Sequence, residues 1–100
     1  MPHTELNSKA EFDQALQTSG KYVLIYAYEG TVNPKADEYA EKFAATTAAY
    51  KVDVSKHEAA KAYFNVTKVP TVVVYKDGKE VKKAEGVDQA GMEEVASILS

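Results

Sequence analysis

The chain of 100 residues contains no cysteine. Disulfide bonds, thiolate catalysis and cysteine-ligated metal sites all need that side chain, so its absence excludes all three. Other metal ligands are not favoured either, because His3 and His57 lie in separate polar segments and no spacing brings carboxylates to them. We therefore expect neither a metal nor another cofactor.

Arginine is also missing. All 12 basic residues are lysines, and 15 acidic residues give the chain a net charge of −3. Arginine is the side chain favoured for bidentate contacts to phosphate and guanine. An acidic chain also lacks the basic footprint of a nucleic-acid-binding domain. We expect no nucleic-acid partner.

Long apolar segments are absent as well. No run approaches the roughly 20 residues that span a membrane. The N-terminal sequence MPHTELNSKAEF lacks the apolar segment of a signal peptide. These features predict a cytoplasmic protein without a membrane partner. The length predicts one domain over residues 1–100.

Local signals in the first half of the chain indicate alternating strands and helices. Residues 3–7 are compatible with a short edge strand. Ser8 and Glu11 have the spacing of a capping box, which starts a helix that Gly20 would stop. Residues 21–28 are almost continuously apolar, as is typical of a central strand covered on both faces.

A second helix is expected directly after this strand. Asn33 fits the N-cap and Pro34 the first helical position. The apolar side chains of this helix fall on one face, namely those of Ala36, Tyr39, Ala40 and Phe43.

The second half of the chain predicts two further helices and a hairpin. Ser55 to Glu58 have the pattern of a second capping box, opening a helix that runs through Phe64. Asp77-Gly78 is a two-residue hairpin signal. The other expected elements are strands at residues 49–54, 71–76 and 79–85 and a last helix capped by Asp88. The order β-α-β-α-β-α-β-β-α predicts a mixed sheet with helices on both faces.

Several stretches resemble the thioredoxin family. YVLIYAY resembles the strand before the family's active site, and KVPTVVVYKDGKEV resembles its cis-proline, next strand and hairpin. KVDVSKHEAAKAYFNV and AEGVDQAGMEEVASIL resemble the elements that precede and follow that hairpin. Val69-Pro70-Thr71 is the most specific piece. The resemblance covers essentially the whole chain and implies an α/β thioredoxin fold, with a mixed central sheet of about five strands flanked by four helices.

The resemblance breaks at the active-site turn. The family reads Trp-Cys-Gly-Pro-Cys there, whereas this chain reads Thr31-Val32-Asn33-Pro34-Lys35. The family's buried acid falls at Tyr26, and the proline that kinks its active-site helix falls at Ala40. Dithiol–disulfide exchange needs an attacking thiolate and a resolving thiol. We therefore predict a redox-inactive protein without thiol–disulfide oxidoreductase activity.

The family's substrate groove maps onto three segments of this chain. The resemblance places them at Thr31, Val32, Asn33, Pro34 and Lys35, at Val69 and Pro70, and at Gly86 and Val87. An extended peptide could pair with the backbone there like an added strand. The resulting hypothesis is a binding or scaffold module whose partner is another protein or an extended peptide. We expect a monomer rather than a homodimer.

Other interpretations remain open. Asn33-Pro34 is also a plain helix start, and Pro70 can serve the fold alone. Tyr26 and Tyr28 read as core, and Lys76, Lys79, Lys82 and Lys83 read as a solvated hairpin face. A different class is a cysteine-independent enzyme using Lys35 and Tyr26, if burial lowers the pKa of the lysine, or a glutathione-binding protein. A designed or engineered cysteine-free thioredoxin scaffold is a further alternative.

Overall fold

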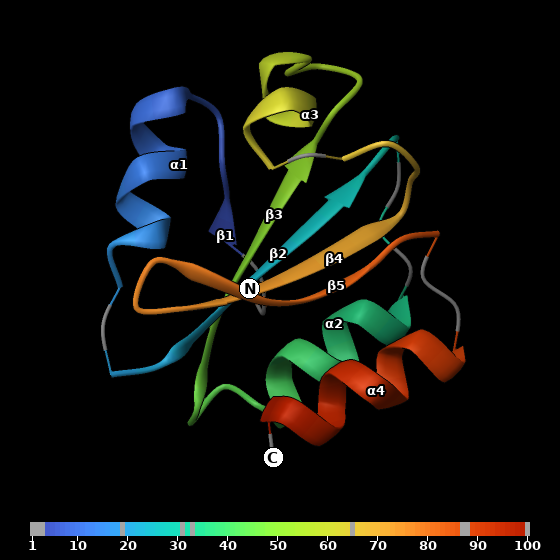
Figure 1. Ribbon diagram of the computed structural model, residues 1–100. Helices are drawn as coiled ribbons and strands as arrows, with labels where there is room; N and C mark the ends of the chain where they lie inside the picture. The colour runs from blue at the N-terminus through green and yellow to red at the C-terminus, as the bar shows by residue number, and fades with distance from the viewer. Residues whose placement is uncertain are drawn as a thin grey trace.

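A computed structural model describes residues 4–18, 20–30, 32, 34–64, 66–86 and 89–99, apart from the side chains of Lys35 and Gln89. Within these residues the elements follow the predicted order (Figure 1): β1 (Thr4–Glu5), α1 (Lys9–Leu16), β2 (Tyr22–Tyr28), α2 (Pro34–Lys42), β3 (Thr47–Asp53), α3 (Ala59–Tyr63), β4 (Thr71–Lys76), β5 (Lys79–Ala84) and α4 (Gln89–Leu99).

The strands form one sheet in the order β1-β3-β2-β4-β5. β1 and β2 each run parallel to β3, whereas β4 runs antiparallel to β2 and to β5. Helices α1 and α3 lie on one face of the sheet, and α2 and α4 lie on the other (Figure 1). The predicted mixed sheet with helices on both faces is confirmed.

The central place of β2 follows from its two apolar faces. Val23 and Ile25 belong to a buried cluster with Phe12 of α1 and with Phe64, the C-cap residue of α3. The alternate residue Tyr26 belongs to a second cluster with side chains of α2 and α4. Successive side chains of a strand point to opposite faces, so an uninterrupted apolar sequence is satisfied only with helices on both sides. The expectation of a doubly covered strand is confirmed.

The first predicted capping box is confirmed. The Ser8 hydroxyl accepts a hydrogen bond from the Glu11 backbone N–H at 3.2 Å. The Glu11 carboxylate reaches back to the backbone N–H of Asn7, at 2.6 Å, rather than to that of Ser8. The helix ends at Leu16, so Gly20 belongs to the following turn and does not stop the helix directly.

The second predicted capping box is wrong. α3 covers only Ala59–Tyr63, and Glu58 precedes it at the N-cap without a side-chain capping bond. Ser55 has a different partner, because its hydroxyl donates to Asp53 Oδ1 at 2.5 Å and its backbone N–H donates to the same oxygen at 2.9 Å. A carboxylate two residues upstream competes for Ser55 and forms a turn in place of a helix start.

α2 begins at Pro34, as predicted, while the expected caps Asn33 and Asp88 lie outside the described residues. Ala36, Ala40 and Phe43 are buried, which confirms the predicted inner face of this helix. The hairpin between β4 and β5 turns at Asp77 and Gly78, with φ angles of 54° and 82°. Two positive φ angles in sequence are what a tight hairpin turn of the Asp-Gly type requires.

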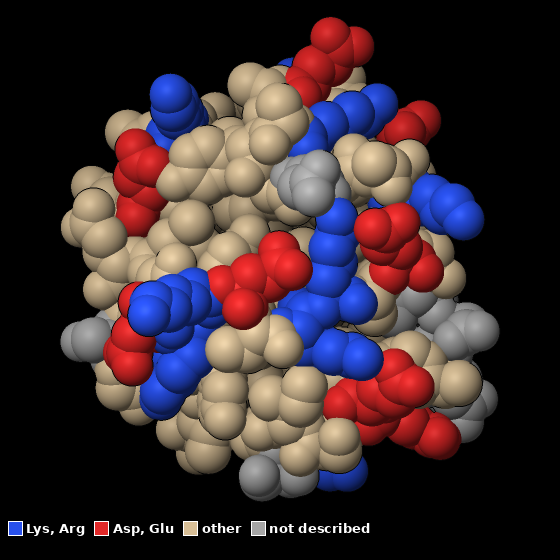
Figure 2. Space-filling view, in the orientation of Figure 1, with Lys and Arg blue, Asp and Glu red and all other residues tan. Residues whose placement is uncertain are grey.

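The hairpin lysines are less solvated than the sequence suggested. Only Lys79 is exposed, and the other three are half-buried. Lys82 pairs with Glu94 at 3.1 Å and Lys83 with Glu85 at 3.2 Å, and Lys76 lies over the ring of Tyr22. Figure 2 shows basic and acidic side chains interspersed on this side of the molecule. Three of the four lysines are therefore engaged by a carboxylate or an aromatic ring, and only Lys79 fits the expected solvated face.

Candidate functional site

A groove of about 460 Å³ lies at the edge of the sheet where β2 ends and β4 begins. The connection before β2 passes over one face of the sheet and the connection after it over the other (Figure 1). The carboxyl end of such a strand is the usual position for ligands in α/β sheets. The groove is lined by Tyr26, Tyr28, Glu29, Val32, Pro34, Val69 and Pro70.

The floor of the groove is aromatic. Tyr26 and Tyr28 are 3% and 6% exposed, and their rings stack with centroids 5.9 Å apart. The Tyr28 hydroxyl donates to Glu5 Oε2 at 3.0 Å. Burial, with that hydrogen bond second, raises the pKa of Tyr28 to about 12. Tyr28 is therefore uncharged at neutral pH.

The two rims carry the apolar side chains that reach solvent. Val32 is half-buried and packs against the cluster formed by Tyr26 and side chains of α2 and α4. Pro34 is the first residue of α2. On the opposite rim the peptide bond between Val69 and Pro70 is cis. Val69 is 37% exposed, and among the described residues only it and Val81 are large apolar side chains of that exposure.

The turn between β2 and α2 is fastened to the end of β3. The buried carboxylate of Asp53 accepts hydrogen bonds from Ser55 and from the backbone N–H of Gly30. The Ser55 side chain first, and then the backbone donors and Lys56, hold the pKa of Asp53 below its usual value, against the opposing effect of burial. Asp53 is therefore ionised at neutral pH, which strengthens its bond to Gly30.

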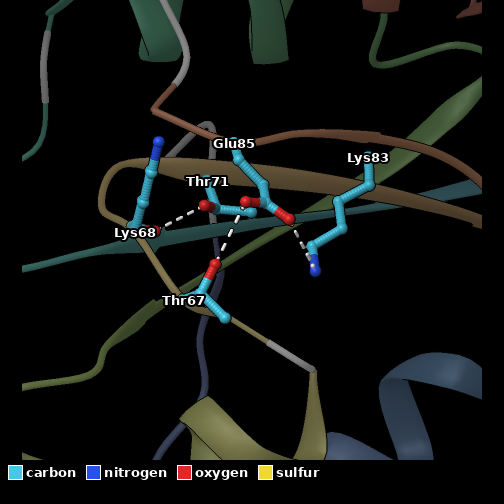
Figure 3. A network of polar contacts seen from close by, with 5 residues as sticks. All are labelled: Thr67, Lys68, Thr71, Lys83 and Glu85. Carbon is cyan, nitrogen blue, oxygen red and sulfur yellow. Dashed lines mark hydrogen bonds and ion pairs between the residues drawn. The ribbon is translucent and has the colours of Figure 1, made fainter.

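The opposite rim is fastened by a second set of contacts (Figure 3). Thr67 Oγ1 donates to Glu85 Oε2 at 3.0 Å, and Lys83 pairs with the other oxygen of the same carboxylate at 3.2 Å. The Thr71 hydroxyl donates to the backbone carbonyl of Lys68 at 2.5 Å. The short segment that carries Val69 is thus bonded on both sides, to the end of β5 and to the start of β4.

The structure brings together four of the predicted groove residues, namely Val32, Pro34, Val69 and Pro70. Gly86 does not line the groove; it lies beside the side chain of Lys68. Thr31, Asn33, Val87 and the side chain of Lys35 lie outside the described residues, and with them the amine chemistry considered for Lys35.

The groove predicted from the sequence did not include Tyr26, Tyr28 or Glu29. The alternation along β2 assigns Tyr28 to the same face as Tyr26, which was a usable signal. Tyr26 and Tyr28 belong to the core, as expected, and they also form the floor.

Neither a candidate metal site nor a candidate membrane-spanning helix occurs among the described residues. No group of three or more histidine, aspartate or glutamate side chains in them is placed to hold a metal ion. No helix among them has both the length and the apolar character needed to cross a membrane.

The order of the strands, the helices on both faces and the groove beside the Val69–Pro70 bond define a thioredoxin fold. Residues 3–98 match the family model for thioredoxin, and the chain belongs to this family. It is 30% identical to a thioredoxin of Geodia cydonium over 97 residues, covering 89% of this chain and 91% of that protein. It is 29% identical to thioredoxin-2 of Saccharomyces cerevisiae over 97 residues, covering 91% and 92%.

The X-ray structure of Fasciola hepatica thioredoxin superimposes on this chain with a TM-score of 0.85 and 25% identity, covering 97% of this chain and 99% of that one. The expected thioredoxin fold is confirmed. The chain is a cysteine-free member of the family, because none of its 100 residues is a cysteine. Thiol–disulfide exchange by its own side chains is therefore impossible.

Proposed function

We propose that this protein is a binding module that holds an extended segment of another protein in the groove between Val32–Pro34 and Val69–Pro70. The observation that carries the proposal is the groove itself, a hollow with two stacked tyrosines on its floor and an exposed valine on its rim. Exposed apolar surface beside a concavity is a recurrent feature of protein interaction sites.

The anchoring of both rims supports this function. Asp53 holds Gly30 on one side and Glu85 holds Thr67 on the other. A ligand that enters a site already held in shape loses less free energy to ordering the protein. These contacts involve no redox group, so they serve a binding role without any chemistry.

The size of the groove favours an extended chain as the ligand. A hollow of about 460 Å³ is at the small end of ligand sites. It accommodates one or two apolar side chains of a peptide, not the face of a helix. The peptide backbone would continue over the rims, where Val69 and Pro70 present main-chain groups to a neighbouring extended chain.

The test uses two exposed valines as a matched pair. Val69→Asp places a charge on the rim of the groove, whereas Val81→Asp places the same charge on β5, outside it. Peptides selected by display against the wild-type protein should bind the Val81→Asp variant with unchanged affinity. They should bind the Val69→Asp variant at least about tenfold more weakly, because a carboxylate would be desolvated in an apolar contact.

Backbone amide shifts in a nuclear magnetic resonance titration should locate the same peptides. Glu29, Val32 and Val69 should move, and Asp77 and Gly78 at the hairpin should not. Equal loss of binding in both valine variants, or shifts confined to the hairpin, would contradict the proposal.

We propose further that the free protein is a monomer. Light scattering should then give the mass of one chain. A dimer that Val69→Asp dissociates would show that a second copy occupies the groove.

A further inference from the structure

A second, smaller hollow continues the groove past Val69. Its volume is about 120 Å³, and it is lined by Glu29, Lys61, Val66, Thr67, Lys68 and Val69. Glu29 and Val69 line both hollows. The surface is therefore continuous, from a half lined mainly by tyrosine, valine and proline side chains between the two rims to a charged half between α3 and the segment before β4.

The charged half contains two exposed lysines from different elements. Lys61 lies in the last turn of α3, and Lys68 lies between that helix and β4. In the described part of the chain neither ammonium group forms an ion pair, in contrast to Lys82 and Lys83 of the hairpin. Two lysines and one glutamate line this small hollow, so the charged side chains of its lining carry an excess of positive charge.

The nearby carboxylate of Glu85 is already engaged. It accepts a hydrogen bond from the hydroxyl of Thr67 and forms an ion pair with Lys83. Figure 3 shows the side chain of Lys68 extending away from that pair, while its stem passes beside Gly86. Lys83 and Thr67 have the larger effects in lowering the pKa of Glu85, and Lys68 adds to them through its charge, but the ion pair of that carboxylate is with Lys83. The exposed ammonium group of Lys68 can therefore also reach a ligand, whereas the Thr67–Glu85–Lys83 contacts hold the segment that carries it.

We propose that the protein selects an extended segment in which an acidic side chain flanks the apolar side chain held in the groove. The apolar side chain would lie over Tyr26 between the two rims, and the carboxylate would lie between Lys61 and Lys68. This inference rests on the proposed function, since it names the class of segment that the same groove recognises. Glu29 lies between the two halves and opposes the effect of the lysines, so its charge should weaken the same ligand.

The experiment compares synthetic peptides of equal length with one central leucine in a serine and glycine context. The flanking position carries glutamate, glutamine or lysine, on the N-terminal side in one series and on the C-terminal side in another. In one of the two series, the glutamate peptide should bind about two- to tenfold more tightly than the glutamine peptide, as expected for one or two solvent-exposed ion pairs. The lysine peptide should bind most weakly. The preference should decrease in high salt, which screens exposed charges.

Variants distinguish the effect of Lys61 and Lys68 from the effect of the overall charge of the protein. Lys61→Gln and Lys68→Gln should each reduce the preference for glutamate, and the double variant should abolish it. Lys79→Gln removes one charge from the exposed hairpin, outside both hollows, and should leave the preference unchanged. Glu29→Gln should strengthen binding of the glutamate peptide, the opposite sign to the lysine variants.

The outcomes distinguish this inference from the function on which it rests. Equal affinity for the glutamate and glutamine peptides, with binding still sensitive to Val69→Asp, would overturn the charge preference and leave the binding module intact. Preference for the lysine peptide would overturn it as well. Absence of binding by every peptide of both series would overturn both proposals.

Discussion

Replacing Ala40 by proline should strongly destabilise this protein. Ala40 lies inside α2, which runs from Pro34 to Lys42, and its side chain is 4% exposed. A proline there cannot donate the backbone hydrogen bond of the helix, and its ring collides with the carbonyl group four residues earlier. The family resemblance places a kink proline at this position, so the variant tests whether α2 of this chain still accommodates a proline there.

The magnitude follows from two terms. Proline in a helix interior costs about 3 kcal/mol relative to alanine. Because Ala40 is buried, the added ring atoms also overpack the core beneath α2. This overpacking lowers the free energy of unfolding by about 1–3 kcal/mol. The sum is about 4–6 kcal/mol, a large part of the roughly 5–15 kcal/mol that keeps a domain folded. At about 4–8 °C per kcal/mol for a domain of this size, the melting temperature should fall by at least roughly 16 °C.

Urea unfolding followed by circular dichroism measures this directly. Ala40→Gly is the matched control, because it removes a methyl group and adds backbone freedom without removing the N–H, for about 1 kcal/mol from propensity. The proline variant should lose several times more free energy of unfolding than the glycine variant. A proline variant as stable as the glycine variant would refute the reasoning, since α2 would then tolerate a kink at Ala40 without cost.

Three other predictions follow from the same contacts. Asp53→Asn should lower the free energy of unfolding at pH 7. Because the pKa of Asp53 is lowered when folded, that deficit should shrink as pH falls below 3.8; a pH-independent deficit in urea unfolding would contradict this. Stability should be lost as pH rises from 10 to 12, because burial raises three tyrosine pKa values, those of Tyr28, Tyr63 and Tyr75, from 10.0 to about 12; phenolate absorbance showing that all seven tyrosines of the chain titrate at 10 without unfolding would contradict this. In an insulin-reduction assay the wild-type protein should add nothing to the rate of the reductant alone, and joint Val32→Cys and Lys35→Cys substitution should add a measurable rate; equal rates for both proteins would argue against the alignment of these positions.

The elements of the fold were predictable because their signals are local and agree with one another. Continuous apolarity in β2 requires helices on both faces, and the Asp77-Gly78 turn permits only a hairpin between the strands beside it. The second capping box failed because a neighbouring side chain competes for its first residue. Ser55 fits a helix start by its spacing, but Asp53 is buried beside Gly30 of another turn and draws Ser55 to itself.

The groove was predictable only in part. Val32 and Val69 are far apart in the sequence, and only the family resemblance indicated that they would face each other. The floor follows from strand alternation, yet the sequence does not show that α2 leaves the end of β2 uncovered beside Tyr28. The charged hollow is harder still to predict, because Lys61 belongs to α3 and Lys68 to the segment before β4, and no local sequence signal indicates that both line one hollow.

The contacts that shape the groove are independent of the chemistry that this chain has lost. Gly30 is held by Asp53 and the segment before β4 by Glu85, and neither contact involves the positions where the family has its cysteines. At the position of the family's buried acid, Tyr26 stacks on Tyr28, so an ionisable group for moving protons is replaced by an aromatic floor. At the position of the attacking cysteine, Val32 adds apolar surface to the rim. The changes at Val32 and Tyr26 therefore remove redox groups and place apolar and aromatic side chains in the groove, while the contacts that shape the groove are retained.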